Sequence, residues 1–212
     1  MQAALHELAS NLDARRMALT KVRRIVASLE GHSLERTAIE MSVPLIYAQW
    51  EGFAKEACTL YLRAIERSRL RLSELREELI AYIWSPQLAQ VSQRLSRDRK
   101  CAIARLALEK MGDSIAIPEK LLTVDTKSNL GFEALDGVCR DLGLGPPPST
   151  INRQRLNALV HLRNNIAHGS SPSTLERSVF EQHAETAISA MLSIETMIID
   201  AISNARYRRK SV

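Results

Sequence analysis

Residues 159–169, with the sequence LVHLRNNIAHG, bring together polar side chains that could act on a phosphodiester. Arg163, Asn164 and His168 lie near the expected end of a helix whose apolar residues hold it in the core. A guanidinium offers a planar fork of donors to the negative charge that develops on a phosphate. A histidine near neutrality suits RNA transphosphorylation, in which the 2′-hydroxyl loses a proton and the 5′-oxygen gains one. This chemistry needs no metal ion.

The spacing of Arg163 and His168 allows both to reach one phosphate, although they do not share a helix face. Five residues of α-helix correspond to roughly 140° of rotation and about 7.5 Å of rise. Arg163 is long, and His168 precedes Gly169, which frees the chain. The partly negative carbonyl end of the helix favours an imidazolium. The same residues also suit a capping and hydrogen-bonding cluster, so the spacing alone leaves both interpretations open.

Three further residues are candidates for supporting roles. Glu51 and Lys55 are four residues apart and are expected to form an intrahelical ion pair. Alternatively, Glu51 faces the motif helix and orients Arg163 or His168. His161 lies seven residues before His168, roughly 10 Å away on nearly the same face. We expect it to pack or hydrogen-bond rather than to act as a second catalyst.

The remaining histidines and the cysteines do not have metal-site spacing. His6, His32 and His183 lack acidic or cysteine companions at ligand spacing, so neither a metal site nor a cofactor is expected. The three cysteines are far apart and show neither zinc-finger nor redox spacing. Their pattern favours a reducing environment and predicts a cytoplasmic location.

Basic residues gather in three clusters, which are Arg67, Arg69 and Arg71; Arg94, Arg97, Arg99 and Lys100; and Arg206, Arg208, Arg209 and Lys210. Such clusters are usually solvated faces. On a protein that acts on RNA they would contact phosphates without reading the sequence. A net charge of +5 allows nucleic acid as a partner, and an aromatic share of 4% argues against a base-stacking platform.

The elements around these residues are predicted to be helical. The chain has 28 leucines and 25 alanines against 15 glycines and prolines, which favours an all-α fold over a sandwich, a barrel or a doubly wound sheet. Residues 3–29 show heptad-like apolar spacing, interrupted at Arg15. A second long helix follows from about Leu34, with Pro44 expected to kink it. The two predict a long N-terminal helical hairpin in an up-and-down bundle.

The rest of the chain completes one predicted domain spanning residues 1–212. Shorter helices are expected within 67–110, a loop at 111–127, and helices over 128–142, from about 149 to 168, and from 173 onwards. Residues 206–212 form a basic tail that is expected to fray. The longest apolar run is six residues, and acidic residues appear early, so neither a membrane span nor a signal peptide is expected.

Three segments carry a resemblance to a known superfamily. Residues 163–169, RNNIAHG, resemble the Arg-x4-6-His motif of the HEPN superfamily, including the Asn that often follows the Arg. Residues 45–55, LIYAQWEGFAK, resemble the second long helix of a bacterial branch, the MAE-like or RiboL-PSP-HEPN group. Residues 126–143, which begin TKSNL, resemble the segment upstream of the motif in that group. The three matches occur in the right order, and from the first to the last they span residues 45–169, which is more than half of the chain.

The resemblance implies a helical bundle that forms a two-fold dimer through the motif helix. It also implies a metal-independent endoribonuclease of a toxin–antitoxin or phage-defence system, with RNA as substrate and an antitoxin or defence protein as partner. Arg163 and His168 would be catalytic, with Asn164 in support. Ser170 stands where some HEPN toxins carry a Tyr that a partner nucleotidyltransferase modifies, so this form of silencing is not expected. The alternative is a catalytically inactive HEPN module that dimerises and binds a partner protein or nucleotide.

Overall fold

The computed structural model describes residues 2–89, 97–126, 128–170 and 175–209, and within these residues the regular structure is helical. In chain order the elements are α1 (Gln2–Ser28), α2 (Glu35–Arg67), the short 3-10 helix η1 (Leu72–Glu74), α3 (Glu77–Ile83), α4 (Ser85–Ala89), α5 (Arg97–Lys110), α6 (Glu119–Leu122), α7 (Phe132–Asp141), α8 (Arg153–Ala167) and α9 (Arg177–Ser203). The all-α prediction is confirmed.

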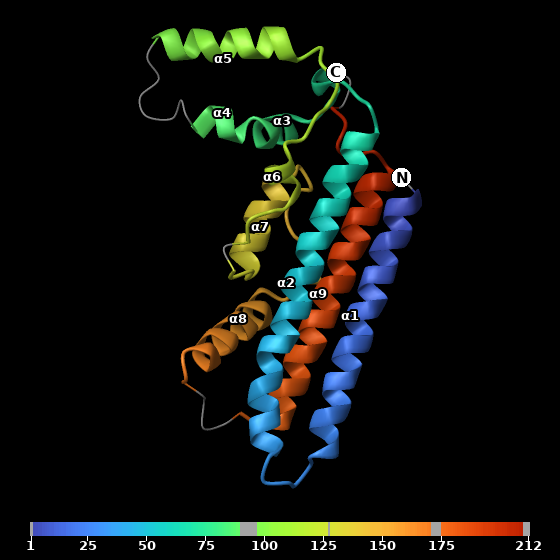
Figure 1. The fold of residues 1–212 in the computed structure, drawn as a ribbon, viewed down its shortest axis with the longest axis vertical. Helices are drawn as coiled ribbons and strands as arrows, with labels where there is room; N and C mark the ends of the chain where they lie inside the picture. The colour runs from blue at the N-terminus through green and yellow to red at the C-terminus, as the bar shows by residue number, and fades with distance from the viewer. Residues whose placement is uncertain (1, 90–96, 127, 171–174, 210–212) are drawn as a thin grey trace.

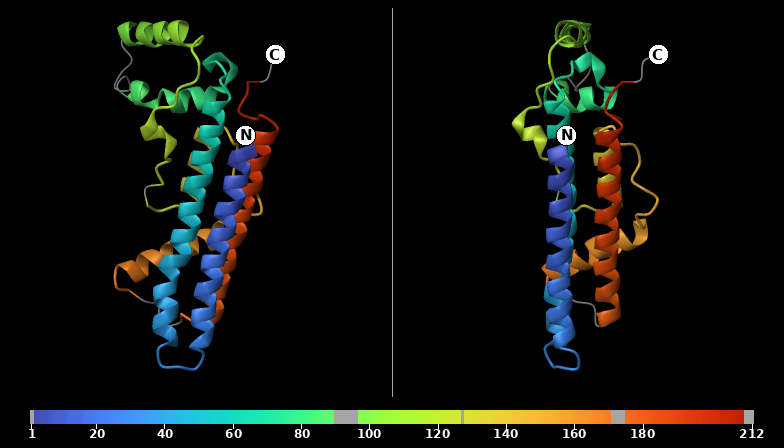
Figure 2. Two further views of the ribbon diagram at one scale, coloured as in Figure 1. Left: turned by 45° about the vertical axis from the view of Figure 1, so that its right-hand side comes forward. Right: turned by 90° about the vertical axis from the view of Figure 1, so that its right-hand side faces the viewer.

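Three long helices form the body of the molecule. Helices α1 and α2 make the predicted antiparallel hairpin, and α9 packs beside both and runs parallel to α2 (Figures 1 and 2). Helix α2 continues through Pro44 to Arg67. Trp50 and Phe53 of α2 and Phe180 of α9 are among the largest fully buried side chains of the core.

Arg15, which interrupts the apolar pattern of α1, lies half-buried at the contact between α1 and α2. A Cβ on Gly52 of α2 would lie 2.6 Å from its Nη1 atom, so the absence of a side chain at Gly52 makes room for the guanidinium. The Nε of Arg15 donates to Asn11 Oδ1 at 2.7 Å. Burial lowers the pKa of Arg15 from its usual value, and the Glu56 carboxylate partly offsets this effect.

Helix α9 is long and apolar enough, by length and composition, to cross a membrane. In the bundle its apolar stripe faces the other helices instead, and half of its most apolar 18-residue stretch is buried inside the protein. The stripe predicted from the sequence, which includes Phe180, Met191 and Ile198, lies in the core. The helix begins at Arg177, and the predicted capping residue Ser173 lies outside the described residues.

The shorter helices are arranged around the three-helix body. Helix α8 crosses α2 obliquely, whereas α3, α4 and α5 lie at the end of the bundle that is far from the α1–α2 turn (Figures 1 and 2). The chain between α6 and α8 follows the side of α2, with α7 packed on α3 and α8. This arrangement places α8, with the predicted motif, directly against α2.

Three sequence predictions about local structure are wrong. The predicted loop at 111–127 contains the short helix α6. Residues 128–131 precede α7 rather than forming its first turn, because their backbone groups bond to side chains of α2 and α8. Arg206 to Arg209 do not fray. The Arg76 N–H donates to Tyr207 O at 3.0 Å, the Arg209 N–H donates to Glu74 O at 2.8 Å, and Tyr207 is buried. Residues 210–212 lie outside the described part of the chain.

Candidate active site

Helix α8 has a defined cap at each end, which fixes the position of the motif. At its start, the Asn152 side chain accepts the Arg155 N–H at 3.0 Å. At its end, Gly169 has a left-handed backbone conformation with a φ of 76°. The Gly169 N–H donates to Ile166 O at 3.0 Å and the Ser170 N–H donates to Asn165 O at 2.8 Å, which is the bonding pattern of a Schellman cap. The predicted stop at Gly169 is therefore observed, with His168 as the residue just beyond the helix.

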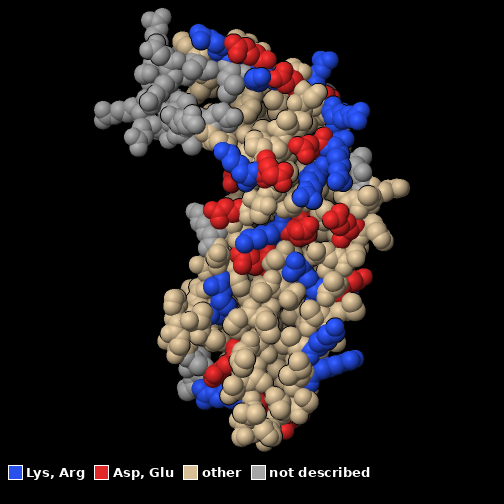
Figure 3. All heavy atoms as spheres, viewed as in Figure 1, with Lys and Arg blue, Asp and Glu red and all other residues tan. Residues whose placement is uncertain are grey.

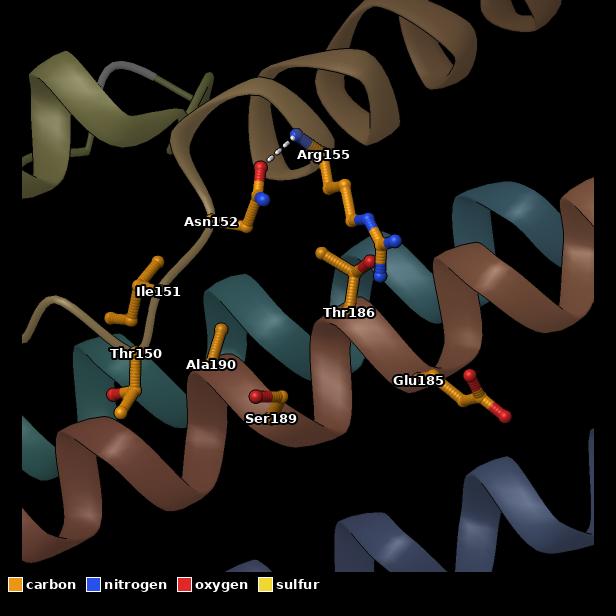
Figure 4. Close-up of a pocket in the computed structure, with 8 residues that line it drawn as sticks. All are labelled: Thr150, Ile151, Asn152, Arg155, Glu185, Thr186, Ser189 and Ala190. Atoms are coloured by element: carbon orange, nitrogen blue, oxygen red, sulfur yellow. Dashed lines mark hydrogen bonds between the residues drawn. The ribbon is translucent and has the colours of Figure 1, made fainter.

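The start of α8 rests on α9 beside a cavity of about 270 Å³. Figure 4 shows Arg155 reaching from α8 toward Thr186 of α9, while Glu185 points away. Ile151 is buried just before the helix begins. A helix of 15 residues is roughly 22 Å long. This anchored end therefore lies far along the axis from His168, and its cavity is separate from the motif.

The His168 imidazole is exposed at the carbonyl end of α8. Its backbone N–H donates to Asn164 O at 3.0 Å and Asn165 O at 3.2 Å, so the main chain is held. Within the described residues the imidazole itself makes no hydrogen bond. The ring is therefore free to meet a ligand or a second protein surface.

Arg163, by contrast, is held by the protein. Its guanidinium lies over the Tyr47 ring, with Cζ 4.0 Å from the ring centroid. Its Nη2 donates to the Ser128 backbone oxygen. Its Nε is buried and has no partner among the described residues. The stack and the bond fix the plane of the guanidinium, and its Nη1 makes no hydrogen bond to the residues that the structure describes.

Tyr47 also holds residues 128–131 through its hydroxyl. The Leu130 N–H donates to Tyr47 Oη at 2.6 Å, and Trp50 Nε1 donates to the Leu130 oxygen at 2.9 Å. Burial raises the pKa of Tyr47, while the Leu130 N–H and the Arg163 guanidinium act in the opposite direction. The neutral phenol is therefore both the acceptor for Leu130 and the ring beneath Arg163.

Asn164 contacts the same segment. Its Nδ2 donates to Asn129 Oδ1 at 3.0 Å. Ser128 adopts a left-handed conformation, with a φ of 53°, that turns its carbonyl region toward α8. Asn164 thus lies in a structural contact between α8 and residues 128–131, and its amide nitrogen is already used there.

A second asparagine of α8 fixes the start of α7. Asn157 Oδ1 accepts the Phe132 N–H at 2.8 Å, and its Nδ2 donates to Glu133 at 2.9 Å. A Cβ on Gly131 would lie 2.7 Å from Asn157 Oδ1, so Gly131 permits this close approach. Hydrogen bonds from Asn157 lower the pKa of Glu133.

Glu51 and Lys55 form the predicted ion pair within α2, with Nζ 3.3 Å from Oε1. The Thr126 hydroxyl also donates to Glu51 Oε1. Glu51 makes no hydrogen bond to Arg163 or His168 in the described part of the chain. Glu51 and Lys55 are therefore an ion pair within α2, as one of the two interpretations predicted. The negative charge of Glu51 also acts on the nearby Tyr47, whose pKa it raises.

The other predicted site residues lie apart from Arg163. His161 is exposed on α8. Arg94 lies outside the described residues, as do the side chains of Arg97, Arg99 and Lys100. The helix that carries these last three residues, α5, lies at the far end of the bundle from α8 (Figure 2). The described residues contain no group of three or more His, Cys, Asp or Glu placed to hold a metal ion.

The sequence interpretation missed Tyr47, Ser128, Asn129 and Asn157. Tyr47 lies in the segment 45–55, and Ser128 and Asn129 lie in TKSNL, so the two resembling segments contain three of the four. What the sequence did not indicate is that these segments meet at Arg163. Together they hold the Arg163 guanidinium in place on α8, and His168 at the end of the same helix is exposed. A fixed guanidinium can bind a phosphate, and an exposed imidazole can exchange a proton.

The family model described as HEPN_MAE_28990/-like HEPN matches residues 4–207. No curated protein and no solved structure matches the chain.

Proposed function

Because the chain belongs to the HEPN_MAE_28990/-like HEPN family, we propose that it is a metal-independent endoribonuclease with Arg163 and His168 as its catalytic residues. The observation that carries the proposal is the contrast between the two side chains. Arg163 is fixed over Tyr47, whereas His168 is exposed at the next turn of the chain. A fixed charge and a free proton carrier are what transphosphorylation requires.

In the proposed reaction the ribose 2′-oxygen attacks the adjacent phosphorus. The 2′-O–P bond forms and the P–O5′ bond breaks, which gives a 2′,3′-cyclic phosphate and a free 5′-hydroxyl. A base removes the 2′-hydroxyl proton, and an acid donates a proton to the leaving 5′-oxygen. Arg163 donates from Nη1 to a non-bridging phosphate oxygen, where negative charge accumulates. His168 acts in proton transfer.

The reaction needs two proton-transfer groups, and the motif supplies one histidine per chain. We propose that two copies of the chain meet at α8, so that a two-fold axis brings both His168 side chains to one cleft. The proposal is supported by exposed apolar side chains on α2, the helix against which α8 packs, among them Met41 and Leu45. Mixed dimers of wild type with His168→Ala would then lose most of their activity rather than half.

The proposed setting is the cytoplasm, in a toxin–antitoxin or phage-defence system with a partner protein that controls cleavage. The three cysteines are free thiols, and Cys58 and Cys139 are buried. Burial raises the pKa of the Cys139 thiol to about 12, so it stays protonated and unreactive. These thiols fit a reducing environment.

One observation favours the alternative, a catalytically inactive module. Arg163 and Asn164 both bond to residues 128–129, so the motif also does structural work that does not depend on RNA. In that case the contacts would hold the fold, and RNA would remain uncut.

The test is incubation of the purified protein with mixed cellular RNA in excess EDTA. Wild type should cut the RNA and leave 2′,3′-cyclic phosphate ends, and His168→Ala should not. His161→Ala is the matched control, because His161 is an exposed histidine on the same helix, and this variant should retain cleavage. Cleavage by folded His168→Ala at the wild-type rate would rule out the proposed role, and intact RNA with wild type would favour the inactive module.

A further inference from the structure

A second site lies at the end of the bundle that holds α3 and the C-terminal segment. A cavity of about 730 Å³, open to solvent, is lined by Arg76, Glu77, Asn204, Ala205, Arg206, Arg208 and Arg209. Four of these seven residues are arginines. Figure 3 shows Lys and Arg side chains gathering near this end, with Asp and Glu among them.

The backbone fixes three of the four arginines. Ala205 has a left-handed conformation, with a φ of 47°, which turns the chain back after α9. The returning segment pairs with the start of α3 through the isolated bridge between Leu75 and Arg208. Tyr207 is buried between the arginines on either side of it. Arg206, Arg208 and Arg209 are therefore set around the cavity by main-chain bonds.

Each guanidinium is oriented by one carboxylate. The four pairs are Arg76 with Glu78, Arg206 with Asp200, Arg208 with Glu74 and Arg209 with Glu77. Such exposed pairs contribute little to stability, about 0–1 kcal/mol each. Each carboxylate occupies one or two of the five N–H groups of its arginine, so most donors stay available. The pairs act chiefly to restrict the side chains around the cavity.

A buried hydroxyl lies near the same arginines. Tyr61 on α2 is fully buried, and its Oη has no hydrogen-bond partner within the described residues. Its ring meets that of Tyr207 edge to face, with centroids 6.4 Å apart. Burial raises the pKa of Tyr61, and the charges of Arg76 and Arg206 oppose that rise. Two of the arginines that line the cavity therefore act electrostatically on the buried Tyr61 hydroxyl.

We propose that this cavity binds a small phosphorylated molecule through Arg76, Arg206, Arg208 and Arg209. Guanidinium forks match phosphate oxygens in geometry and charge, and the volume lies within the usual range for small-molecule sites. The four carboxylates paired with these arginines, Glu77 in the cavity lining among them, disfavour a long continuous polyanion such as RNA, so a small phosphorylated molecule is the expected ligand.

The cavity is distinct from the candidate active site. Tyr47, beneath Arg163, and Tyr61, which contacts Tyr207 of the segment that lines the cavity, are 14 residues apart on α2, which corresponds to about 21 Å along the helix axis. A ligand in the cavity therefore does not occupy the place of the scissile phosphate. The inference holds whether or not the protein cuts RNA.

The test is calorimetric titration of the full chain with pyrophosphate and with inorganic phosphate at constant ionic strength. The site variant is the double substitution Arg206→Gln and Arg209→Gln. The control is Arg140→Gln, because Arg140 is an exposed arginine paired with Asp136 on α7, outside the cavity. Circular dichroism melting checks that all variants fold.

We expect pyrophosphate to bind wild type with one site per chain. Binding should weaken at least tenfold in the double variant and stay unchanged in the control. Three results would overturn the proposal: no heat of binding at millimolar pyrophosphate, equal weakening in the control, and binding of a non-cleavable RNA oligonucleotide at this cavity in place of pyrophosphate.

Discussion

Substitution of the two motif residues should separate their structural and chemical roles. Arg163→Ala removes the stack on Tyr47 and the bond to Ser128. His168→Ala removes an exposed ring without a hydrogen bond among the described residues. Both changes should abolish RNA cleavage, but only the first should destabilise the protein.

The size of the effect follows from the contacts. A half-exposed cation–π contact contributes about 1 kcal/mol. A partly exposed hydrogen bond from a charged donor contributes about 1 kcal/mol more. Arg163→Ala should therefore lower the free energy of unfolding by about 2 kcal/mol, which for a chain of this length lowers Tm by roughly 4–8 °C. His168→Ala should change the free energy of unfolding by less than about 0.5 kcal/mol.

The assay combines urea unfolding, followed by circular dichroism, with RNA cleavage at 25 °C, where both variants remain folded. Arg163→Lys adds a useful intermediate, because lysine keeps the charge but lacks the planar fork. It should recover part of the stability and little of the activity. The reasoning fails if Arg163→Ala unfolds at the wild-type urea concentration, or if His168→Ala proves as unstable as Arg163→Ala.

Three other expectations concern the reaction, a buried histidine and a strained turn. Cleavage should persist in excess EDTA and spare DNA, which lacks the attacking 2′-hydroxyl; strict magnesium dependence in a gel assay would contradict this mechanism. His183 is buried and its pKa is lowered by burial. As the pH falls below about 6.5, His183 binds a proton in the unfolded chain but stays neutral in the folded chain. The free energy of unfolding should therefore fall by up to about 1.4 kcal/mol per pH unit. Urea unfolding between pH 7 and 5 should show this pH dependence for wild type and for His161→Gln, a control at an exposed histidine. The dependence should be weaker for His183→Leu, and an equal dependence in all three proteins would exclude His183 as the cause of the loss of stability. Ala205→Gly should raise the free energy of unfolding by about 0.5–1 kcal/mol, because glycine relieves the left-handed strain at more than its entropic cost, and a lower urea midpoint would refute this.

The long helices could be predicted from the sequence because their apolar spacing is strong and local. The α9 stripe predicted over Phe180 to Ala201 lies in the core, and the α1–α2 hairpin forms as expected. Gly169 was readable as a helix stop for the same reason, since a left-handed cap is a local property of glycine. Elements whose conformation depends on residues close in the sequence could therefore be predicted.

Residues 128–131 show where such reasoning stops. Their apolar and polar pattern continues smoothly into α7, so it predicts a helix from 128. In the fold, the Leu130 N–H and carbonyl bond to Tyr47 and Trp50, 83 and 80 residues away in the sequence. These side chains satisfy the backbone groups that a helical turn would otherwise use. Nothing local to the segment indicates partners at that distance.

The prediction that the C-terminal segment frays was wrong for a related reason. Four basic residues within 206–210 are typical of a solvated tail, and the prediction of fraying follows from that composition. Tyr207 is the exception within the run, and its burial holds the segment against α3. The burial of one aromatic ring thus holds the segment in place although its other residues are charged. The neighbouring arginines stay exposed to solvent and line the cavity.

The candidate site divides its residues into those that the fold holds and one that it leaves free. Tyr47 and Trp50, on adjacent turns of α2, hold Leu130; the Ser128 and Asn129 positions fixed in this way then hold Arg163 and Asn164. A group that stabilises charge acts best when it is already in place before the charge develops, and Arg163 meets that condition. A group that transfers protons must reach both solvent and substrate, and the exposed His168 meets that one. Because the Arg163–His168 motif supplies one histidine per chain, the proposed reaction, which needs both an acid and a base, calls for a second copy of the same motif.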